Sequence, residues 1–468
     1  MINKIEKKFR GAVKDKDNRD IVKGGSFAFI NKVAGIGLNY IWTFLLAHMY
    51  GSKGTGAYNI FQTVFQFFSN FGKLGYDTLM MRETARYNAV KNWRAIRELY
   101  FKVLRVNVFA AIICSALMFL SADLIAGKVF LKPGLAEFFR IGALAILPFV
   151  LHSLHVDCIR GMKRIFYFGF FQNVLTFGLL AIIISASWFI IHDRRVPVSV
   201  YIISISVSSA CSFWYWFNKT PMNKKKIETI DENLTEEISY EKVVMSEKNK
   251  IAFSLFLTSL LQLIRGWSDT IFLGRFGTEE DVGVYKVAFK IATVTSLTLT
   301  AMLLTVAPKI AELHAKGELK RMGIVAQNTT KLIFWTSAPV LILFILFPQF
   351  FMGIFGDDFL KGNVCLIILA LGQFVNACSG PVGNLLMMTG KQDLNRNIVF
   401  GTTVITVTLN AIFIPVYGII GAAAVNALGL ILFNVIPLFY IKHYYGFYTF
   451  DPKHIFSFSR KKFLKQDK

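Results

Sequence analysis

Seven basic residues lie inside long apolar stretches of this 468-residue chain, and four of them are candidates for chemistry: Lys32, Arg265, Lys286 and Lys290. A charge at the centre of a membrane-spanning helix costs at least about 2.5–3.5 kcal/mol to insert, so such a residue usually faces a cavity or a partner. Lysine and arginine side chains that gather in one place bind phosphate and pyrophosphate well. These residue types therefore predict an anion-binding site in a cavity of low dielectric constant.

Lys286 and Lys290 are one helical turn apart in the apolar stretch 282–306, which contains no acid. We therefore expect their charges to be uncompensated. At 1.5 Å per residue they lie roughly 6 and 12 Å from the outer end of this stretch, and Arg265 lies roughly 12 Å deep in the preceding one. Two alternatives remain: Lys286 reaches the interface alone, or Arg265 pairs with Asp269 four residues away.

Acids are rarer in the apolar stretches, where only Asp77, Asp157 and Asp269 occur. Lys73 precedes Asp77 by four residues, and this spacing predicts an ion pair along one helix. The excess of intramembrane bases over acids favours an anionic ligand rather than a cationic one.

Motifs of soluble enzymes and metal sites are absent from the sequence. It contains no GxxxxGK[ST] loop, no HExxH and no GxSxG, and its five cysteines are scattered without CxxC spacing. His152 and His155, close to Asp157, leave a metal site open, but we favour histidines that face a cavity or are satisfied by neighbours. We therefore predict no enzyme, no metal and no cofactor.

The elements that must position these residues are membrane-spanning helices. The chain is 54% hydrophobic with a mean hydropathy of +0.49, and its apolar blocks are long enough to cross a bilayer. We predict about twelve transmembrane helices in an all-α polytopic protein, at 26–47, 58–80, 101–120, 138–158, 165–190, 197–217, 251–273, 282–306, 331–347, 363–388, 397–417 and 419–441.

The basic residues alternate between the two sides of the predicted membrane. Alternate inter-span regions, beginning with the N-terminal tail, hold 38 lysines and arginines, whereas the other set holds seven. Basic loops stay in the cytoplasm, so both termini are predicted to be cytoplasmic. The net charge of +23 is explained in this way without nucleic-acid binding. No cleavable signal peptide is visible before the first span.

The two halves of the chain resemble each other. Gly56-Ala57-Tyr58 returns as Gly283-Val284-Tyr285, Glu83 returns as Glu312, and Gly161 returns as Gly390, with offsets of 227–229 residues. Six spans per half give a parallel repeat, and transporters of this design bind substrate between their halves. The predicted divisions are a basic tail at 1–25, a six-helix lobe at 26–217, a cytoplasmic linker at 218–250, a second six-helix lobe at 251–441 and a basic tail at 442–468.

Two matching cytoplasmic stretches, Arg82–Lys102 and Lys309–Lys331, combine Ala and Leu with Glu, Arg and Lys. This composition predicts interfacial helices that contact anionic membrane lipids.

With these features in place, the chain resembles the polysaccharide (O-antigen, Wzx-like) flippases of the multidrug/oligosaccharidyl-lipid/polysaccharide superfamily. The resemblance covers nearly the whole chain and has no catalytic signature. It rests on the helix Ser26–Tyr50 with the following Gly51–Tyr58, on Arg82–Arg86, on Arg160–Arg164, on Asp269–Tyr285 and on Asn410–Gly421.

The resemblance implies a V-shaped, MATE-like fold of two lobes in the bacterial cytoplasmic membrane. It implies alternating access that moves an undecaprenyl-pyrophosphate-linked oligosaccharide outward through a cationic cavity. By this analogy Lys32, Arg265, Lys286 and Lys290 bind the headgroup. Coupling to Na⁺ or H⁺ is implied as well, with Asp77, Asp157 and Asp269 as candidate sites. Polysaccharide polymerase and ligase machinery are the implied partners.

Two other transporters of the same fold remain as alternatives. An ion-coupled multidrug exporter is one, although cationic drugs favour an acidic cavity. A lipid II flippase is the other, but that class usually carries two additional C-terminal spans.

Overall fold

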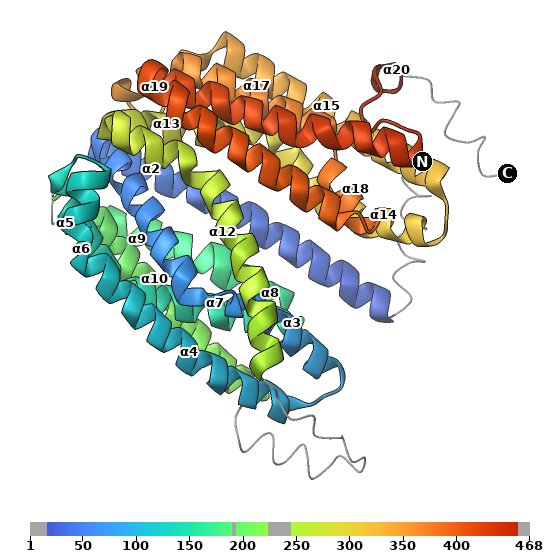
Figure 1. Cartoon of the computed structure of the whole chain (residues 1–468), viewed down its shortest axis with the longest axis horizontal. Coiled ribbons are helices and arrows are strands. Elements are labelled where there is room, and N and C mark those ends of the chain that lie inside the picture. Colours follow the sequence, from blue (N-terminus) through green and yellow to red (C-terminus); the bar gives the residue numbers. More distant parts are fainter. Residues whose placement is uncertain (1–15, 190–192, 223–244, 457–468) are drawn as a thin grey trace. The chain divides into compact units, whose positions relative to one another are not determined.

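The computed structural model describes residues 16–189, 193–222 and 245–456, and within these ranges it is helical without β-strands (Figure 1). The all-α prediction is therefore confirmed for the described part of the chain. Much of the predicted tails and linker lies outside it, at 1–15, 223–244 and 457–468. The chain forms two compact units, Met1–Leu263 and Ile264–Lys468. This division falls within one long helix, α12, while the predicted lobe boundaries stay a prediction.

The first unit contains the helices from α2 to α10 and the beginning of α12. Their bounds are α2 (Lys16–Lys73), α3 (Tyr76–Ala89), α4 (Trp93–Leu120), α5 (Ala122–Leu124), η1 (Ile125–Val129), η2 (Pro133–Leu135), α6 (Ala136–Ala143), α7 (Ile146–Gly161), α8 (Ile165–Gly169), η3 (Phe170–Leu175), α9 (Thr176–Trp188), α10 (Val196–Lys219) and α12 (Met245–Phe276).

The second unit contains the end of α12 and all later helices. Their bounds are α13 (Glu279–Ala292), η4 (Thr293–Ser296), α14 (Leu297–Ala315), α15 (Leu319–Leu346), α16 (Pro348–Gly353), η5 (Asp357–Gly362), α17 (Asn363–Ser379), α18 (Val382–Met388), α19 (Gln392–Tyr445) and α20 (Pro452–Ile455).

Two glycines divide the longest helices. Gly51 in α2 has φ 64° and Gly418 in α19 has φ 54°, and both interrupt the helical backbone. A side chain at either position would be strained, because positive φ is disfavoured for residues with a Cβ atom. The breaks lie next to the predicted boundaries between spans 26–47 and 58–80 and between spans 397–417 and 419–441.

Eight helices in the described residues are long and apolar enough to cross a membrane, and nine if Pro133–Ala143 and Ile146–Gly161, bent by 49°, form one span. Gly418 lies inside one of these eight, which is counted once. Large apolar side chains such as Phe109 and Ile182 are exposed on them, as expected where lipid replaces water. The protein is therefore a multi-span membrane protein, and the total of twelve spans stays a prediction.

A core of buried side chains joins α3, α4, α7 and α10 in the first unit, with Leu79, Leu99, Leu154 and Trp216 among its members. The end of α7 lies very close to α3, because a Cβ atom at Gly161 would be 2.6 Å from the carbonyl oxygen of Met81. Only a residue without a side chain fits this crossing.

Gly161→Ala is therefore expected to destabilise the protein by about 1–3 kcal/mol, the usual range for overpacking a close contact. The measurement is the thermal unfolding midpoint of the solubilised protein, which should fall. Gly401→Ala in α19 is the matched control, because a Cβ atom there meets nothing within 4 Å. An equal midpoint for both variants would contradict the close crossing.

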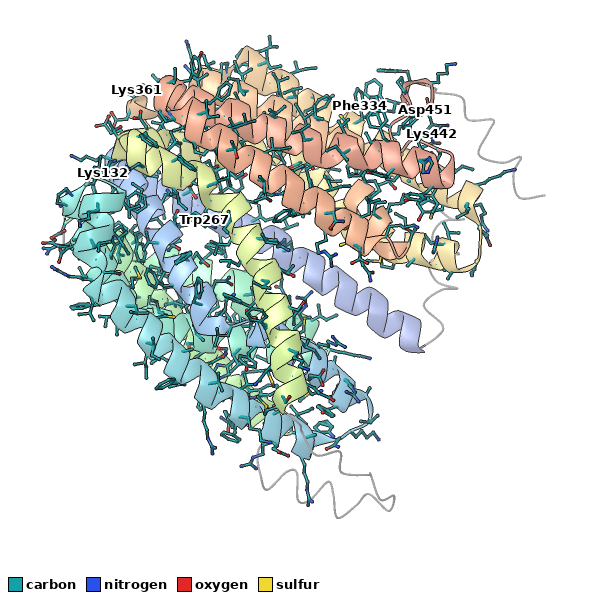
Figure 2. The ribbon with its side chains drawn as sticks, in the orientation of Figure 1. Lys132, Trp267, Phe334, Lys361, Lys442 and Asp451 are labelled. Atoms are coloured by element: carbon teal, nitrogen blue, oxygen red, sulfur yellow. The ribbon has the colours of Figure 1, made fainter. Side chains whose placement is uncertain are left out.

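In the second unit the residues after α19 pack onto α15 and α17. Gln327 Nε2 donates to the carbonyl oxygen of Tyr448 at 2.9 Å, and Thr449 Oγ1 donates to that of Ser379 at 2.6 Å. Figure 2 labels Phe334 on α15 and Asp451, which caps α20 at the end of this segment. These contacts attach residues 447–456 to the second unit.

Candidate functional site

The predicted cation Lys286 is held by an acid from the neighbouring helix. Its Nζ lies 3.7 Å from Asp269 Oδ1, so α13 and α12 form an ion pair, and both side chains are largely buried. The Lys286 ammonium also lies 4.9 Å from the ring centroid of Trp267, which Figure 2 labels. The expectation that Lys286 is uncompensated was therefore wrong, because its counter-ion comes from a different helix.

Both carboxylate oxygens of Asp269 accept hydrogen bonds inside the second unit. Tyr285 Oη donates to Oδ2 at 2.5 Å, and the backbone N–H and hydroxyl of Thr270 donate to Oδ1 at 2.6 and 3.0 Å. The side chain of Asp269 is thus fixed in position, and it binds α12 to α13.

Arg265 does not pair with Asp269, so that alternative was wrong. Within the described residues its guanidinium forms no ion pair or hydrogen bond, and it lies 4.2 Å from the ring centroid of Phe433. The side chain is half-buried. A guanidinium stacked on an aromatic ring keeps its five N–H donors available in the plane of the group.

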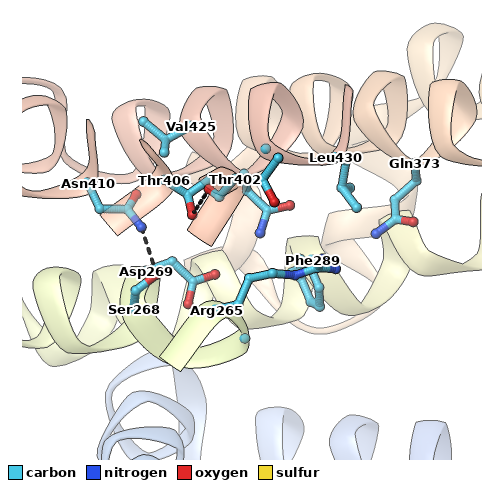
Figure 3. A pocket seen from close by; sticks show the side chains of 13 residues that line it. Arg265, Ser268, Asp269, Phe289, Gln373, Thr402, Thr406, Asn410, Val425 and Leu430 are labelled. Carbon is cyan, nitrogen blue, oxygen red and sulfur yellow. Dashed lines mark hydrogen bonds between the residues drawn. The ribbon is translucent and has the colours of Figure 1, made fainter. Parts of the chain in front are cut away.

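Arg265 lines a cavity of about 130 Å³ inside the second unit (Figure 3). Asp269 lies on the same wall from α12, Phe289 comes from α13, and Gln373 comes from α17. The opposite wall is α19, which contributes Thr402, Thr406, Asn410 and Asn426. The helix break at Gly418 lets both parts of α19 face this space.

Two amide oxygens at this cavity have no partner among the described residues: Asn410 Oδ1 and Asn426 Oδ1. The Asn410 amide is oriented by its Nδ2, which donates to Ser268 Oγ at 3.0 Å, and the residue is only 3% exposed. Gln373 Oε1, in contrast, accepts from Ser296 Oγ at 2.9 Å. Buried acceptors are normally paired with protein or ordered water, so these two oxygens mark positions where a donor from outside the described chain would complete the hydrogen bonding.

The other predicted headgroup residues do not line this cavity. Lys290 is half-buried on α13, one turn beyond Lys286, and Lys32 is exposed on α2 of the first unit. The structure therefore places Arg265 and Asp269 on the wall of the cavity and links Lys286 to it only through the ion pair with Asp269, while Lys290 and Lys32 lie outside it.

The predicted local ion pair is present in the first unit, where Lys73 Nζ lies 2.9 Å from Asp77 Oδ2. It does not lie along one helix, because α2 ends at Lys73 and Leu74 and Gly75 have positive φ before α3 begins. Asp77 is in the first turn of α3, where a carboxylate is favoured by the helix dipole. Asp157, half-buried on α7, has no ion pair or hydrogen bond within the described residues. The three carboxylates thus differ in the ion pairs and hydrogen bonds that they already make with protein groups.

The histidines of α7 lie in a polar cluster. His155 Nε2 lies 2.9 Å from Tyr100 Oη, and His152 Nδ1 lies 3.3 Å from Ser212 Oγ. Among the described residues, no three His, Cys, Asp or Glu side chains form a group that could hold a metal ion. Each histidine thus has one side-chain partner, while Nδ1 of His155 is buried without a hydrogen-bond partner among the described residues.

A buried ion pair that sequence reasoning missed joins α12 to α3. Lys248 Nζ lies 2.5 Å from Glu83 Oε2, and these side chains are only 9% and 2% exposed. Beside it, Tyr76 Oη donates to Asn249 Oδ1 at 2.8 Å. Both charges belong to predicted cytoplasmic loops, so their sequence context gave no signal of burial.

The internal repeat has a structural counterpart in the same helices. Trp42 and Tyr58 are 16 residues apart in the first unit, and their rings are 5.4 Å apart. Asp269 and Tyr285, at the repeat positions, are also 16 residues apart and share a hydrogen bond. The second unit thus has a carboxylate where the first has an indole ring, which makes this charge specific to one half.

Comparisons with known proteins agree with this architecture. Residues 21–314 match the family model "Polysaccharide biosynthesis protein", and residues 254–415 match the MatE model. The chain is 27% identical to the probable low-salt glycan biosynthesis flippase Agl15 of Haloferax volcanii over 179 residues. This stretch covers 38% of this chain and 38% of Agl15. The chain is 26% identical over 302 residues to the teichuronic acid biosynthesis protein TuaB of Bacillus subtilis, which is 62% of this chain and 56% of TuaB. The matches thus span about half or less of these relatives.

Two solved structures show that the fold is MATE-like. An inward-facing multidrug resistance MATE family transporter superimposes with a TM-score of 0.70 and 14% identity, covering 90% of this chain and 98% of that one. The lipid II flippase MurJ, in an inward closed conformation, superimposes with a TM-score of 0.67 and 13% identity. This match covers 90% of this chain and 87% of MurJ. Since the polysaccharide biosynthesis model matches more than half of the residues, the chain belongs to the polysaccharide biosynthesis protein family.

Proposed function

We propose that this membrane protein is a flippase rather than an enzyme, and that it moves a lipid-linked oligosaccharide across the cytoplasmic membrane by alternating access. The family match and the similarity to Agl15, a probable low-salt glycan biosynthesis flippase, support transport of a glycan precursor. The observation that carries the proposal is the half-buried Arg265, which lacks a counter-ion within the described residues. A cation placed in this way is suited to an anionic group of the lipid-linked glycan, on its carrier or on one of its sugars.

The predicted headgroup residues then have unequal roles. Arg265 is the principal anion ligand, because its guanidinium is available. Lys286 also binds the anionic headgroup while it keeps its ion pair with Asp269. Lys290 adds a second ammonium group one turn away on α13. Lys32, on α2, is the candidate from the first unit.

Ion coupling is proposed to involve Asp157 before Asp77 or Asp269. Asp77 is paired with Lys73, and Asp269 is occupied by Tyr285, Thr270 and Lys286. A carboxylate whose oxygens already accept hydrogen bonds or ion pairs binds Na⁺ or H⁺ less favourably than a carboxylate without such partners. The coupling ion is therefore proposed to be bound in the first unit.

The proposed surroundings follow from the basic loops. Both termini are cytoplasmic, the exposed apolar side chains face membrane lipids, and the polymerase and ligase machinery of polysaccharide assembly receives the product. Nucleic acid is not a partner. The alternatives are a multidrug exporter and a lipid II flippase, since structural neighbours at 13–14% identity establish the fold alone.

The test is a reconstituted flipping assay. A fluorescent undecaprenyl-pyrophosphate oligosaccharide in vesicles with an imposed ion gradient becomes accessible to an external quencher if it is moved between leaflets. We expect quenching that exceeds that of protein-free vesicles, and no gain of drug resistance when the protein is expressed in a sensitised strain. Drug efflux without glycan movement would favour the multidrug exporter, and selective movement of lipid II would favour the lipid II flippase.

A further inference from the structure

We propose that the cavity of the second unit binds a single sugar ring that carries a carboxylate, as in a uronic acid. This inference rests on the proposed function, because it assigns one glycosyl unit of the transported glycan to a defined subsite. The argument uses the size of the cavity, the available guanidinium of Arg265 and the unpaired oxygens of Asn410 and Asn426.

The size of the cavity agrees with one ring. Its volume is about 130 Å³, and an engineered cavity of about 150 Å³ in another protein binds benzene. Phe289 supplies an apolar wall, against which the C–H face of a sugar can pack. A longer glycan must therefore extend beyond the cavity, with only one of its rings inside.

The guanidinium of Arg265 supplies the anionic specificity. Stacking on Phe433 at 4.2 Å holds it in place, and no described residue neutralises it. Guanidinium groups bind carboxylates through two parallel N–H···O bonds, and these bonds are stronger than those between neutral groups. A sugar carboxylate would give Arg265 the counter-ion that Asp269 gives to Lys286.

The unpaired amide oxygens require donors from the ligand. Asn410 Oδ1 and Asn426 Oδ1 can only accept hydrogen bonds. The hydroxyl groups of a sugar both donate and accept, so they can donate to these two oxygens, whereas the hydroxyls of Thr402 and Thr406 on the same wall already donate to backbone carbonyls. A fully ionised phosphate provides acceptors alone and leaves both asparagine oxygens unsatisfied.

A bound cation fits the same cavity less well. Asp269 is its one acidic residue among the described lining, and that carboxylate is already engaged by Tyr285, Thr270 and Lys286. The positive charge of Arg265 in the same wall opposes a second cation. A ligand with one negative charge and several hydroxyls matches all of these groups together.

Calorimetric titration of the full chain in lipid nanodiscs tests the proposal and avoids sugar-based detergents. The probes are methyl β-D-glucuronide and its neutral counterpart methyl β-D-glucoside, at constant ionic strength. We expect the glucuronide to bind at least about tenfold more tightly, since only it can form the paired hydrogen bonds to Arg265. Equal affinities, or no binding of either sugar, would overturn the proposal.

Variants assign the contacts. Arg265→Gln should remove the preference for the glucuronide, Arg265→Lys should keep part of it, and Asn410→Ala should weaken both sugars about fivefold or more. Arg396→Gln is the matched control, because Arg396 is exposed and pairs with Asp393 on the surface of the same unit. Unfolding midpoints establish that each variant is folded. Sodium binding that depends on Asn410, without sugar binding, would assign the cavity to a cation instead.

Flipping of two lipid-linked glycans, with and without a uronic acid, separates this inference from the proposed function. Equal flipping of both, with no glucuronide binding, would reject the subsite and leave the flippase intact. Glucuronide binding without flipping of either glycan would reject the flippase and leave a sugar-binding cavity.

Discussion

Replacing Lys286 and Lys290 together with glutamine is expected to abolish transport of the lipid-linked glycan without loss of expression. A hydrogen bond to a charged group contributes about 1.5–3 kcal/mol, so the loss of two should slow transport by at least about a hundredfold. Both side chains lie on one face of α13, one helical turn apart. The measurement is the initial rate of flipping by equal amounts of protein in vesicles.

The ion pair with Asp269 allows a sharper version of this experiment. If Lys286 serves only to neutralise Asp269, then Lys286→Gln combined with Asp269→Asn should restore transport. If Lys286 contacts the anionic headgroup, as we propose, the double variant should remain as slow as Lys286→Gln alone. Lys361→Gln is the charge-matched control, because Lys361 is exposed and pairs with Glu280. Normal flipping by the Lys286/Lys290 variant would remove both residues from the site.

Glu83→Gln is expected to destabilise the protein by about 3–5 kcal/mol, because it leaves the buried ammonium of Lys248 without its counter-ion. The two groups lie 2.5 Å apart, and both side chains are at most 9% exposed. Lys248→Met should have an effect of similar size for the same reason. The measurement is the unfolding midpoint of the solubilised protein, with ligand absent.

Removing both charges should restore much of this stability. Glu83→Leu with Lys248→Met replaces a buried ion pair by apolar side chains, and such exchanges are often neutral or stabilising. A double variant as unstable as the single ones would show that the hydrogen bond itself, rather than an unpaired buried charge, holds α12 on α3.

Glu312 is the natural control, because it occupies the repeat position of Glu83. Its side chain is 41% exposed and pairs with Lys309 and Lys316 at 2.7 Å each. These two ammonium groups lower the pKa of its carboxyl to about 2, so it is ionised at neutral pH. Since solvent screens an exposed ion pair, Glu312→Gln should leave the unfolding midpoint nearly unchanged. A large fall would contradict the different burial of the two glutamates.

Burial decides this difference, and the sequence alone does not reveal it. Glu83 and Glu312 stand at equivalent places in the repeat and in similar basic, helical surroundings. The partner of Glu83 is 165 residues away. Whether two such residues meet depends on which helices pack together and on how each is rotated about its axis.

The sequence by itself determined the features that arise within one helix or from average polarity. Apolar blocks of about 20 residues identify membrane helices because uncovered backbone polar groups are too costly in lipid. The spacing of Lys73 and Asp77 predicted an ion pair, which is present, but it bridges the turn between α2 and α3 instead of lying along one helix. The parallel repeat with its offset of 227 residues stays a prediction, although Trp42 contacts Tyr58 and Asp269 bonds to Tyr285 at positions related by this offset.

Only the tertiary structure decided the partners of the intramembrane charges. The spacing of Arg265 and Asp269 permitted a pair, yet Asp269 instead meets Lys286, and Arg265 stacks on Phe433. Asn410 and Asn426 gave no signal, because a neutral amide in an apolar stretch has no pattern that distinguishes a ligand from a satisfied core residue. Local spacing limits which residues can interact, but the packing of helices far apart in the chain selects the pairs that do.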